Sequence, residues 1–354
     1  NFSPFQAMTM YQFSGDLEYL NGIGAVPQGI GNEDLGWERE LSYNLGTDIS
    51  LFDRRLNFTF DIYLKKTTDL VLDASRAPST GTTSAKENIG EMENKGLEFQ
   101  VDGMLVQRND FYWQVAATGS MNRNRILKIN SALKKANEDA NKVDSKTPLA
   151  QYEEGESTTA LKVVKSAGID PATGQEVFIK LNGERTFEYS ADDKFVIGDT
   201  EPRFRGTVST NLFYKGFSLY LLGRYECGAY LYNETRATKV EGANPKKNAD
   251  KRVFDSRWKS PGDIAFYKDI ADSDGWGTNP KHSDRFVEKE NVFTLGTVNF
   301  GYEFGQNICS KIGVRNLRVG VNLTDIVRWS NVKIERGTTY LYSNGFEFTL
   351  STTF

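Results

Sequence analysis

Apolar and polar residues alternate along the end of the chain, where residues 345–354 form one predicted strand. Phe346, Phe348 and Leu350 fall on one side of an extended chain together with Phe354, and the intervening glutamate, serine and threonines fall on the other. This period of two is typical of a strand with lipid on one side and a polar interior on the other. The edge strand of a soluble sheet alternates in the same way, because antiparallel sheets also bury one face and wet the other. The stretch alone leaves both interpretations open.

The same alternation recurs along the chain and predicts an all-β fold built from nine long antiparallel strands. These strands are longer than the about five or six residues usual in soluble proteins, which favours a membrane barrel. Short turns join most of them pairwise into hairpins. The nine predicted strands are residues 37–50, 56–70, 93–106, 111–125, 203–213, 217–230, 291–304, 317–328 and 345–354.

The connections between the predicted strands alternate between short and long. The long polar segments 1–36, 126–202 and 231–290 are predicted as loops, with a small hairpin inside the second of them at residues 176–189. Residues 71–91 are predicted as a further loop rich in serine, threonine, glycine and alanine. Outer-membrane barrels have short periplasmic turns and long outside loops, whereas a soluble sandwich has no reason for this alternation.

Aromatic residues gather where the predicted strands end. Amphipathic rings prefer the boundary between membrane and water. We therefore interpret the aromatic residues at the two ends of the strands as two interfacial girdles, one at each boundary. The alternative for any single ring is ordinary core packing. The girdle candidates are Trp37, Tyr230, Trp329 and Tyr340 beside long connections, and Tyr112, Trp113 and Tyr302 beside short turns.

Three aromatic residues lie within the predicted loop 231–290 and are candidates for contact with a substrate or a lid. These are Trp258, Tyr267 and Trp276. A tryptophan ring in a loop can stack on a sugar ring, and it can equally anchor the loop by packing inward. The sequence leaves both roles open.

Charge and composition exclude several classes of protein. The 354 residues carry 43 Lys and Arg against 47 Asp and Glu, which gives a net charge of −4. The sequence also has no dense basic run, so its charge does not indicate a surface that binds nucleic acid. No apolar run approaches the ~18–20 residues of a membrane helix, which a barrel does not need. The only cysteines, Cys227 and Cys309, provide neither a disulfide framework nor a thiolate metal cluster. The chain opens Asn-Phe-Ser, so we expect a mature product or a fragment.

Catalytic and metal-binding patterns are weak. His282 is the only histidine, which excludes a multi-histidine metal site, and neither a Gly-x-Ser-x-Gly elbow nor a P-loop occurs. The aspartates of residues 269–274 do not follow the spacing of an EF-hand calcium loop, and we interpret them as a solvated loop. The glutamates of residues 153–156 fit a charged loop better than a glycosidase pair, whose separation a sequence does not report. We therefore expect no enzyme, no metal and no cofactor.

A series of short blocks occurs along nearly the whole chain. They are Leu35-Gly-Trp-Glu38, Leu51-Phe-Asp-Arg-Arg-Leu56, Tyr63-Leu-Lys-Lys-Thr-Thr-Asp-Leu70, Asn88-Ile-Gly-Glu-Met-Glu-Asn-Lys-Gly96, Gly168-Ile-Asp-Pro-Ala-Thr-Gly174, Tyr214-Lys-Gly-Phe217, Arg257-Trp-Lys-Ser-Pro-Gly-Asp263 and the terminal Phe354. Together and in this order, the blocks resemble the C-terminal barrel portion of SusC/RagA-type TonB-dependent transporters of the Gram-negative outer membrane. The run Tyr340-Leu-Tyr-Ser-Asn344 departs from the Tyr-Pro motif expected there.

The resemblance implies a 22-stranded transmembrane barrel whose plug and early strands lie outside this chain. It implies a SusD-like surface lipoprotein as a lid, and TonB, acting through the missing N-terminal part, as the source of energy for importing oligosaccharides or oligopeptides. The long loops would be extracellular, the C-terminus periplasmic and the outer face in contact with lipid. Phe346, Phe348, Leu350 and Phe354 resemble the C-terminal signal for outer-membrane assembly.

Nine strands leave two edges of a sheet unpaired. In hydrocarbon each unsatisfied backbone group costs several kcal/mol, so we expect a separate segment to supply the remaining strands and the plug. Two alternatives remain from the residues themselves. One is a soluble or surface-anchored β-rich module that binds glycans through loop aromatics, and the other is a glycoside hydrolase, which requires two catalytic carboxylates.

Overall fold

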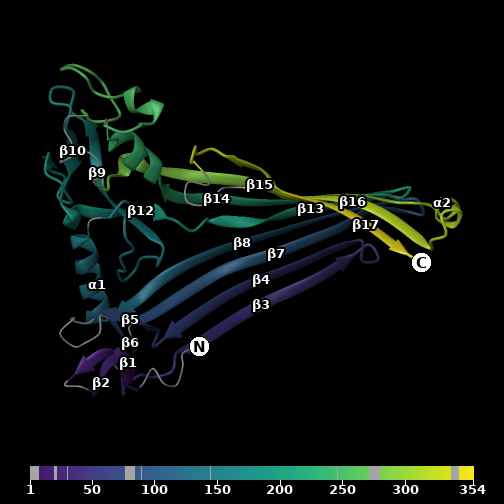
Figure 1. The fold of residues 1–354 in the computed structure, drawn as a ribbon, viewed down its shortest axis with the longest axis horizontal. Coiled ribbons are helices and arrows are strands. Elements are labelled where there is room, and N and C mark those ends of the chain that lie inside the picture. The colour runs from purple at the N-terminus through teal and green to yellow at the C-terminus, as the bar shows by residue number, and fades with distance from the viewer. Residues whose placement is uncertain are drawn as a thin grey trace.

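The computed structural model describes residues 8–19, 22–29, 31–75, 84–88, 90–143, 145–244, 246–270, 280–335 and 343–354. Its dominant element is a nine-stranded antiparallel sheet (Figure 1). All nine predicted strands are confirmed. In spatial order they are β3 (Arg39–Leu51), β4 (Leu56–Thr68), β7 (Gly90–Arg108), β8 (Phe111–Ile129), β13 (Phe204–Tyr214), β14 (Phe217–Tyr232), β15 (Val287–Glu303), β16 (Asn316–Ser330) and β17 (Gly345–Thr353).

Connections within the sheet are short at one end and long at the other (Figure 1). The turn between β13 and β14 places Lys215 and Gly216 at φ values of 45° and 90°, the pair of positive angles that a two-residue type I′ hairpin requires. The turn between β3 and β4 contains three consecutive residues of positive φ, residues 52–54. A short helix, α2 (Gln306–Lys311), joins β15 to β16 at the same end. The predicted alternation of short and long connections is therefore confirmed.

The register gives the sheet one apolar and one polar face, because directly opposed residues of neighbouring strands share a face. One cross-strand row is Phe58, Val101, Ala117 and Val208, and the adjacent row is Thr59, Gln100, Thr118 and Thr207. The apolar face is open to the surroundings: Leu45, Phe346 and Phe348 are 69%, 71% and 63% exposed. We call the two sides of the sheet the apolar face and the polar face.

Glycines let large rings lie flat on the apolar face. A Cβ on Gly119 would stand 2.4 Å from the ring of Phe99, and a Cβ on Gly206 would stand 2.0 Å from the carbonyl oxygen of Thr118. The Tyr225 hydroxyl covers Gly206 and donates a hydrogen bond to that same carbonyl at 2.6 Å. A larger residue at Gly206 would displace backbone, and one at Gly119 would displace the ring of Phe99.

A second folded unit, the loop cap, stands at the long-connection end of the sheet (Figure 1). It combines a four-stranded sheet with helical segments drawn from both long connections. Its members are α1 (Ser131–Lys142), β9 (Ala160–Ile169), β10 (Glu176–Ile179), β11 (Arg185–Thr186), β12 (Lys194–Asp199), the π-helix η4 (Arg236–Glu241) and the 3-10 helices η3 (Ala191–Asp193), η5 (Lys251–Phe254) and η6 (Asp284–Phe286). The cap has its own buried core, with Val163, Val164, Val240 and Phe286 all at 0% exposure.

The predicted loops contain more regular structure than the sequence indicated. Residues 1–36 were predicted as loop, and this is wrong for β1 (Met10–Tyr19) and β2 (Gly22–Gly29), which pair as a hairpin. Within the range 71–91, also predicted as loop, β5 (Val71–Ser75) and β6 (Ser84–Asn88) pair with each other in the same way. The predicted hairpin at residues 176–189 is confirmed as β10 and β11, but β9 and β12 beside it were not predicted. Glycine and proline in residues 10–29 disfavour strands locally, and pairing between β1 and β2 overrides that preference.

The sheet is open, with β3 and β17 at its two edges. Every residue of β3 and β17 is exposed. Among the described residues, no helix is both long and apolar enough to cross a bilayer.

Candidate functional site: a polar groove beneath the loop cap

Three cavities follow one another along the polar face of β3, β4, β7 and β8. The first, of about 820 Å³, lies between these strands and the cap residues 155–160 and 196–203, and Ile62, Leu97 and Met121 of the apolar face also line it. It shares Tyr63 and Asn122 with a second cavity of about 620 Å³, which in turn shares Asp61 and Glu98 with a third of about 350 Å³. Neighbouring cavities share lining residues and therefore adjoin one another, and we call this row of three cavities the polar groove.

Amide side chains and a tyrosine hydroxyl line the cap end of the groove. The Tyr63 hydroxyl donates to Asn122 Oδ1 at 3.1 Å, and Asn124 Nδ2 donates to Asn94 Oδ1 at 2.8 Å. The backbone N–H of Thr158 in the cap donates to Asn124 Oδ1 at 2.9 Å. This bond attaches the cap directly to the groove wall. Amides and hydroxyls both donate and accept, so this end of the groove suits a ligand rich in hydroxyl or amide groups.

Carboxylates line the next section of the groove. Asp61 and Glu98 are directly opposed across β4 and β7, an arrangement of like charges that weakens a strand pair. Asn44 Nδ2 donates to Asp61 Oδ1 at 3.2 Å. Arg205, on the same cross-strand row, lies 3.5 Å from Glu201. Within the described residues, no group of three His, Cys, Asp or Glu side chains lies close enough to hold a metal ion.

The cap is joined by a buried ion triad centred on Arg285. Its guanidinium donates to Glu176 through Nε at 2.7 Å and Nη2 at 2.6 Å, and to Glu241 through both Nη atoms at 2.8 Å. The side chains of these three residues are no more than 7% exposed. Burial by itself disfavours the charged guanidinium, but the two carboxylates outweigh it and raise the pKa of Arg285. One residue of η6 thus binds β10 of the first long connection and η4 of the second.

Further contacts bind the two long connections into a single body. Val164 N–H donates to the carbonyl of His282 at 2.9 Å, and Ser166 N–H donates to Asp284 Oδ1 at 2.9 Å. Burial raises the pKa of the Asp284 carboxyl. Arg257 donates to the carbonyls of Val253, at 2.7 Å, and of Val240, at 2.6 Å. Burial lowers the pKa of Arg257, because the neighbouring carboxylates only partly offset it.

The predicted loop aromatics lie inside the cap and away from the groove. Trp258 is 9% exposed, and its indole N–H donates to the carbonyl of Pro171 at 2.9 Å. Tyr267 is 6% exposed and packs in a core cluster with Phe286. Both therefore anchor the cap, which favours the second of the two roles left open by the sequence. Trp276 lies outside the described residues.

The girdle candidates divide between the two faces of the sheet. Trp329 stacks beside Phe293 and Trp113 is opposed to Leu212, all on the apolar face. Tyr302, opposed to Phe217, shares that face. Tyr112 does not fit the girdle: consecutive strand residues point to opposite sides, and its hydroxyl donates to Gln114 on the polar face at 2.6 Å.

The remaining girdle candidates lie towards the cap. Trp37 precedes β3 and is 71% exposed. Tyr230, near the end of β14, packs its ring against Gly198 of β12 and so supports the cap. Tyr340 lies outside the described residues.

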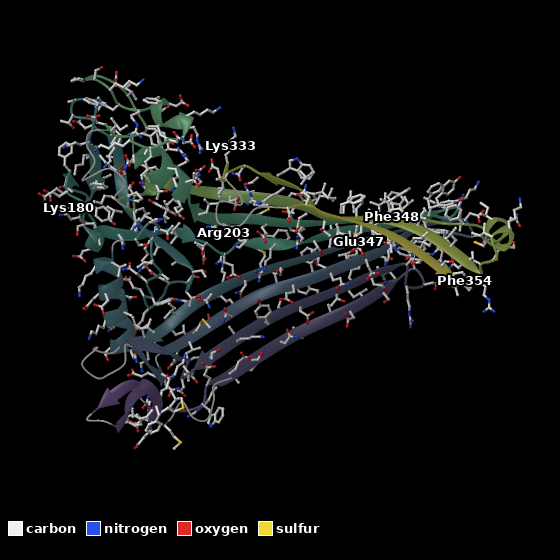
Figure 2. All side chains as sticks on the ribbon, viewed as in Figure 1. Lys180, Arg203, Lys333, Glu347, Phe348 and Phe354 are labelled. Carbon is white, nitrogen blue, oxygen red and sulfur yellow. The ribbon has the colours of Figure 1, made fainter. Side chains whose placement is uncertain are left out.

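The C-terminal residues follow the predicted alternation. Phe346, Phe348 and Leu350 lie on the apolar face, opposed to Leu323, Val321 and Val319 of β16. Figure 2 shows Phe348 and Phe354 on the last strand, well away from the cap residues Lys180 and Arg203. Phe354 is 81% exposed.

Sequence reasoning missed both the groove residues and the ion triad. Tyr63 and Asn122 were ordinary polar positions of alternating strands, and only the register places them side by side. Glu176 and Arg285 are 109 residues apart, a distance at which no local spacing signals a contact. The block Arg257-Trp-Lys-Ser-Pro-Gly-Asp263 was a usable signal, since it contains two buried anchors of the cap.

Comparison with known proteins identifies relatives of this architecture. Residues 2–152 match the family model described as TonB dependent receptor-like, beta-barrel. The chain is 24% identical to TonB-dependent receptor P39 of Formosa agariphila, covering 92% of this chain and 35% of the relative. It is 33% identical over 100 residues to TonB-dependent receptor SusC of Bacteroides thetaiotaomicron, covering 28% of this chain and 10% of SusC.

Solved structures share the fold. The structure of the RagAB peptide transporter superposes with a TM-score of 0.76 at 22% identity, over 92% of this chain and 35% of that one. The RagAB peptide importer in its open-open state gives the same TM-score at 20% identity, over 100% of this chain and 38% of that one. The chain thus spans about a third of the length of the proteins it matches.

Proposed function

We propose that this chain, whose residues 2–152 match the TonB dependent receptor-like β-barrel model, forms part of an outer-membrane importer for oligosaccharides or oligopeptides. One observation carries the proposal. A sheet of nine long strands exposes a continuous apolar face on one side and holds a polar groove beneath folded loops on the other. Lipid satisfies the first face and a hydrated cargo suits the second.

The barrel is completed by strands outside this chain. Those strands pair with the exposed edges of β3 and β17, since unpaired backbone groups are costly in hydrocarbon. The short turns lie on the periplasmic side, which places the loop cap outside the cell and the C-terminus in the periplasm. A closed barrel of 22 strands is wide enough to hold a plug in its lumen, and displacement of that plug opens the lumen.

TonB supplies the energy through the missing N-terminal part, and a SusD-like surface lipoprotein covers the cap. The rigid joining of the two long connections supports this part of the proposal, because a lid needs a fixed surface against which to close. The groove residues Tyr63, Asn94 and Asn122 offer hydrogen bonds to either class of cargo, sugar hydroxyls or peptide amides.

A soluble glycan-binding module is a weaker alternative. It requires loop aromatics on the surface, whereas Trp258 and Tyr267 are buried. It also requires a polar outer surface, whereas Leu45, Phe346 and Phe348 are exposed on a face without cover from any described residue.

Two substitutions on β8 in the intact receptor test the proposal. Asn122→Trp fills the groove, and Val115→Trp places the same ring on the apolar face of the same strand, away from the groove. We expect uptake of the growth substrate to fall at least tenfold for Asn122→Trp and to stay near wild type for Val115→Trp. Outer-membrane abundance, followed by immunoblot, controls for assembly. Equal uptake by two equally abundant variants contradicts the proposal.

A further inference from the structure

One aromatic ring lies flat on the floor of the polar groove. Tyr63 of β4 is directly opposed to Gly96 of β7, which is in turn directly opposed to Asn122 of β8. The Tyr63 hydroxyl donates to Asn122 Oδ1 at 3.1 Å, so the side chain crosses β7 to reach the next strand but one. Neighbouring strands lie about 4.8 Å apart, and a tyrosine can make this contact only by lying along the sheet instead of standing upright on it.

The glycine beneath the ring makes this arrangement possible. A Cβ on Gly96 would stand 2.5 Å from the hydroxyl oxygen of Tyr63 and 2.6 Å from its Cζ. The backbone of β7 therefore covers one face of the ring, and the other face is turned towards the 820 Å³ and 620 Å³ cavities, both of which Tyr63 lines. The Lys65 ammonium lies 5.8 Å from the ring centroid, close to the ~6 Å limit of a cation–π contact, so it covers that face only loosely.

The 620 Å³ cavity surrounds this ring with hydrogen-bonding groups. Every side chain that lines it is polar, and three of them are the amides of Asn44, Asn94 and Asn122. Asn94 Oδ1 accepts from Nδ2 of Asn122 at 3.4 Å and from Nδ2 of Asn124 at 2.8 Å. Among the described residues, the two N–H groups of Asn94 have no acceptor, so they are available to a ligand.

A flat ring beside amides suits a sugar better than a peptide. A pyranose has C–H groups on its faces, which can stack on a tyrosine, and hydroxyls around its edge, which both donate and accept hydrogen bonds. An extended peptide binds a sheet through free backbone groups at an edge, whereas β4 and β7 are paired on both sides. The 620 Å³ cavity also offers no apolar pocket for peptide side chains, since Leu97 and Met121 line only the cavity nearer the cap.

The charges of this section favour a neutral sugar. Asp61 and Glu98 line the cavity together with a single cation, Lys65. The next cavity contains the same two carboxylates and Arg205, which lies 3.5 Å from Glu201. Carboxylates accept hydrogen bonds from sugar hydroxyls, but they would repel a sulfate or a uronate.

We propose that Tyr63 is the stacking platform of a subsite for a neutral pyranose unit, which makes the cargo a neutral oligosaccharide. The sugar ring lies over the open face of Tyr63, and its hydroxyls reach Asn44, Asn94 and the carboxylates beside them. The inference rests on the proposed importer function and narrows the cargo from two classes to one.

The test uses the intact receptor, purified in detergent and applied to an array of neutral hexose and pentose oligosaccharides of both anomeric linkages. Oligogalacturonates, sulfated galactan oligosaccharides and tryptic casein peptides are placed on the same array. We expect binding to neutral oligosaccharides. Tyr63→Leu, which removes the ring, should weaken that binding about tenfold, the factor that ~1.4 kcal/mol for an aromatic stacking contact gives. Tyr63→Phe keeps the ring and should retain most of the binding.

A tyrosine on the neighbouring strand provides the matched control. Tyr43 of β3 is opposed to Leu64 on the apolar face and is 61% exposed, so Tyr43→Leu removes an equal ring away from the groove. This variant should bind as the wild type does. Heat-modifiable gel mobility shows for each variant that the barrel has formed.

Several outcomes would overturn the proposal. They are stronger binding of casein peptides or anionic oligosaccharides than of any neutral oligosaccharide, binding of no neutral oligosaccharide, and equal binding by Tyr63→Leu and the wild type. Equal losses in Tyr63→Leu and Tyr43→Leu would have the same meaning. Uptake by Asn122→Trp reports separately on import: peptide uptake that this variant blocks would leave the importer function standing and remove only the sugar subsite.

Discussion

The sheet and the loop cap treat their large apolar side chains in opposite ways. In the sheet, Leu45 and Phe348 are 69% and 63% exposed, whereas in the cap Val163 and Phe286 are at 0%. The cap packs around its own apolar core, as a water-soluble protein does, whereas the apolar face of the sheet has no such cover. One chain therefore contains two regions whose stability depends on different surroundings, water for the cap and lipid for the sheet.

Charged groups follow the same division. The cap buries Arg285 between two carboxylates, where each charge is compensated by short hydrogen bonds. The sheet keeps its charges on the polar face or at the rim of the apolar face, as with Asp61, Arg224 and Arg123. A substitution should thus reveal which of the two environments surrounds it.

The largest effect is expected inside the cap. Arg285→Met leaves Glu176 and Glu241 buried without compensation, and breaking such a network destabilises by about 3–5 kcal/mol. Hydrogen exchange should accelerate in β10 and η4 while the barrel keeps its heat-modifiable gel mobility. Arg252→Met, whose ion pairs with Asp250 and Glu335 are partly exposed, is the control and should change little. Similar exchange in both variants would mean that the triad does not hold the cap together.

A charge on the apolar face should have the next largest effect. Val208→Arg, in the middle of β13, places a guanidinium in hydrocarbon and should destabilise the inserted protein by about 2–4 kcal/mol. Ser209→Arg introduces the same group on the polar face one residue later and should be tolerated. Urea titration in lipid vesicles measures both. Equal destabilisation would show that lipid does not cover the apolar face.

Removal of Phe354 should have a smaller energetic effect, with a clear consequence for assembly. Burial of this ring against lipid contributes only about 2–3 kcal/mol. Because the last strand resembles an assembly signal, we expect the amount of inserted protein to fall much more than the uptake per inserted molecule. Quantitative immunoblotting of outer membranes beside an uptake assay separates the two quantities. Normal abundance with lost uptake would refute this role.

The smallest effect is expected from the titration of Tyr189 in the cap. Burial raises the pKa of its hydroxyl from 10.0 to about 12. A group with a raised folded pKa contributes stability that is present below the unfolded pKa and lost as the pH rises towards the folded value. The cap should therefore lose stability between pH 10 and about pH 12, and Tyr189→Phe should remove that part of the loss. Hydrogen exchange corrected for its own pH dependence, compared between the two proteins, measures it, and identical curves would exclude Tyr189 as the source.

The strand content of this protein was predictable because the signal is local. Alternation with a period of two is visible within a single strand, so all nine strands of the sheet were identified, from residues 37–50 to residues 345–354. The separation of apolar from polar residues follows from the same periodicity. The hairpins β1–β2 and β5–β6 were missed because the glycine-rich segment of the first and the short five-residue strands of the second carry almost none of it.

The candidate site was much less predictable. The sequence identified Trp258 and Tyr267 as unusual loop residues but not the direction in which they point, and both are buried. Tyr112 and Trp113 were assigned one role, although consecutive residues of a strand lie on opposite faces.

The sequence by itself determined which residues of each strand share a face, because strand geometry imposes that arrangement wherever an extended chain forms. Only the tertiary structure decided which strands meet, where the polar groove lies and how the two long connections join. Arg285 lies 109 residues from Glu176 and 44 from Glu241. Contacts between residues so far apart leave no periodic pattern in the sequence. The three charges are stable when buried only if all three are present and paired with one another.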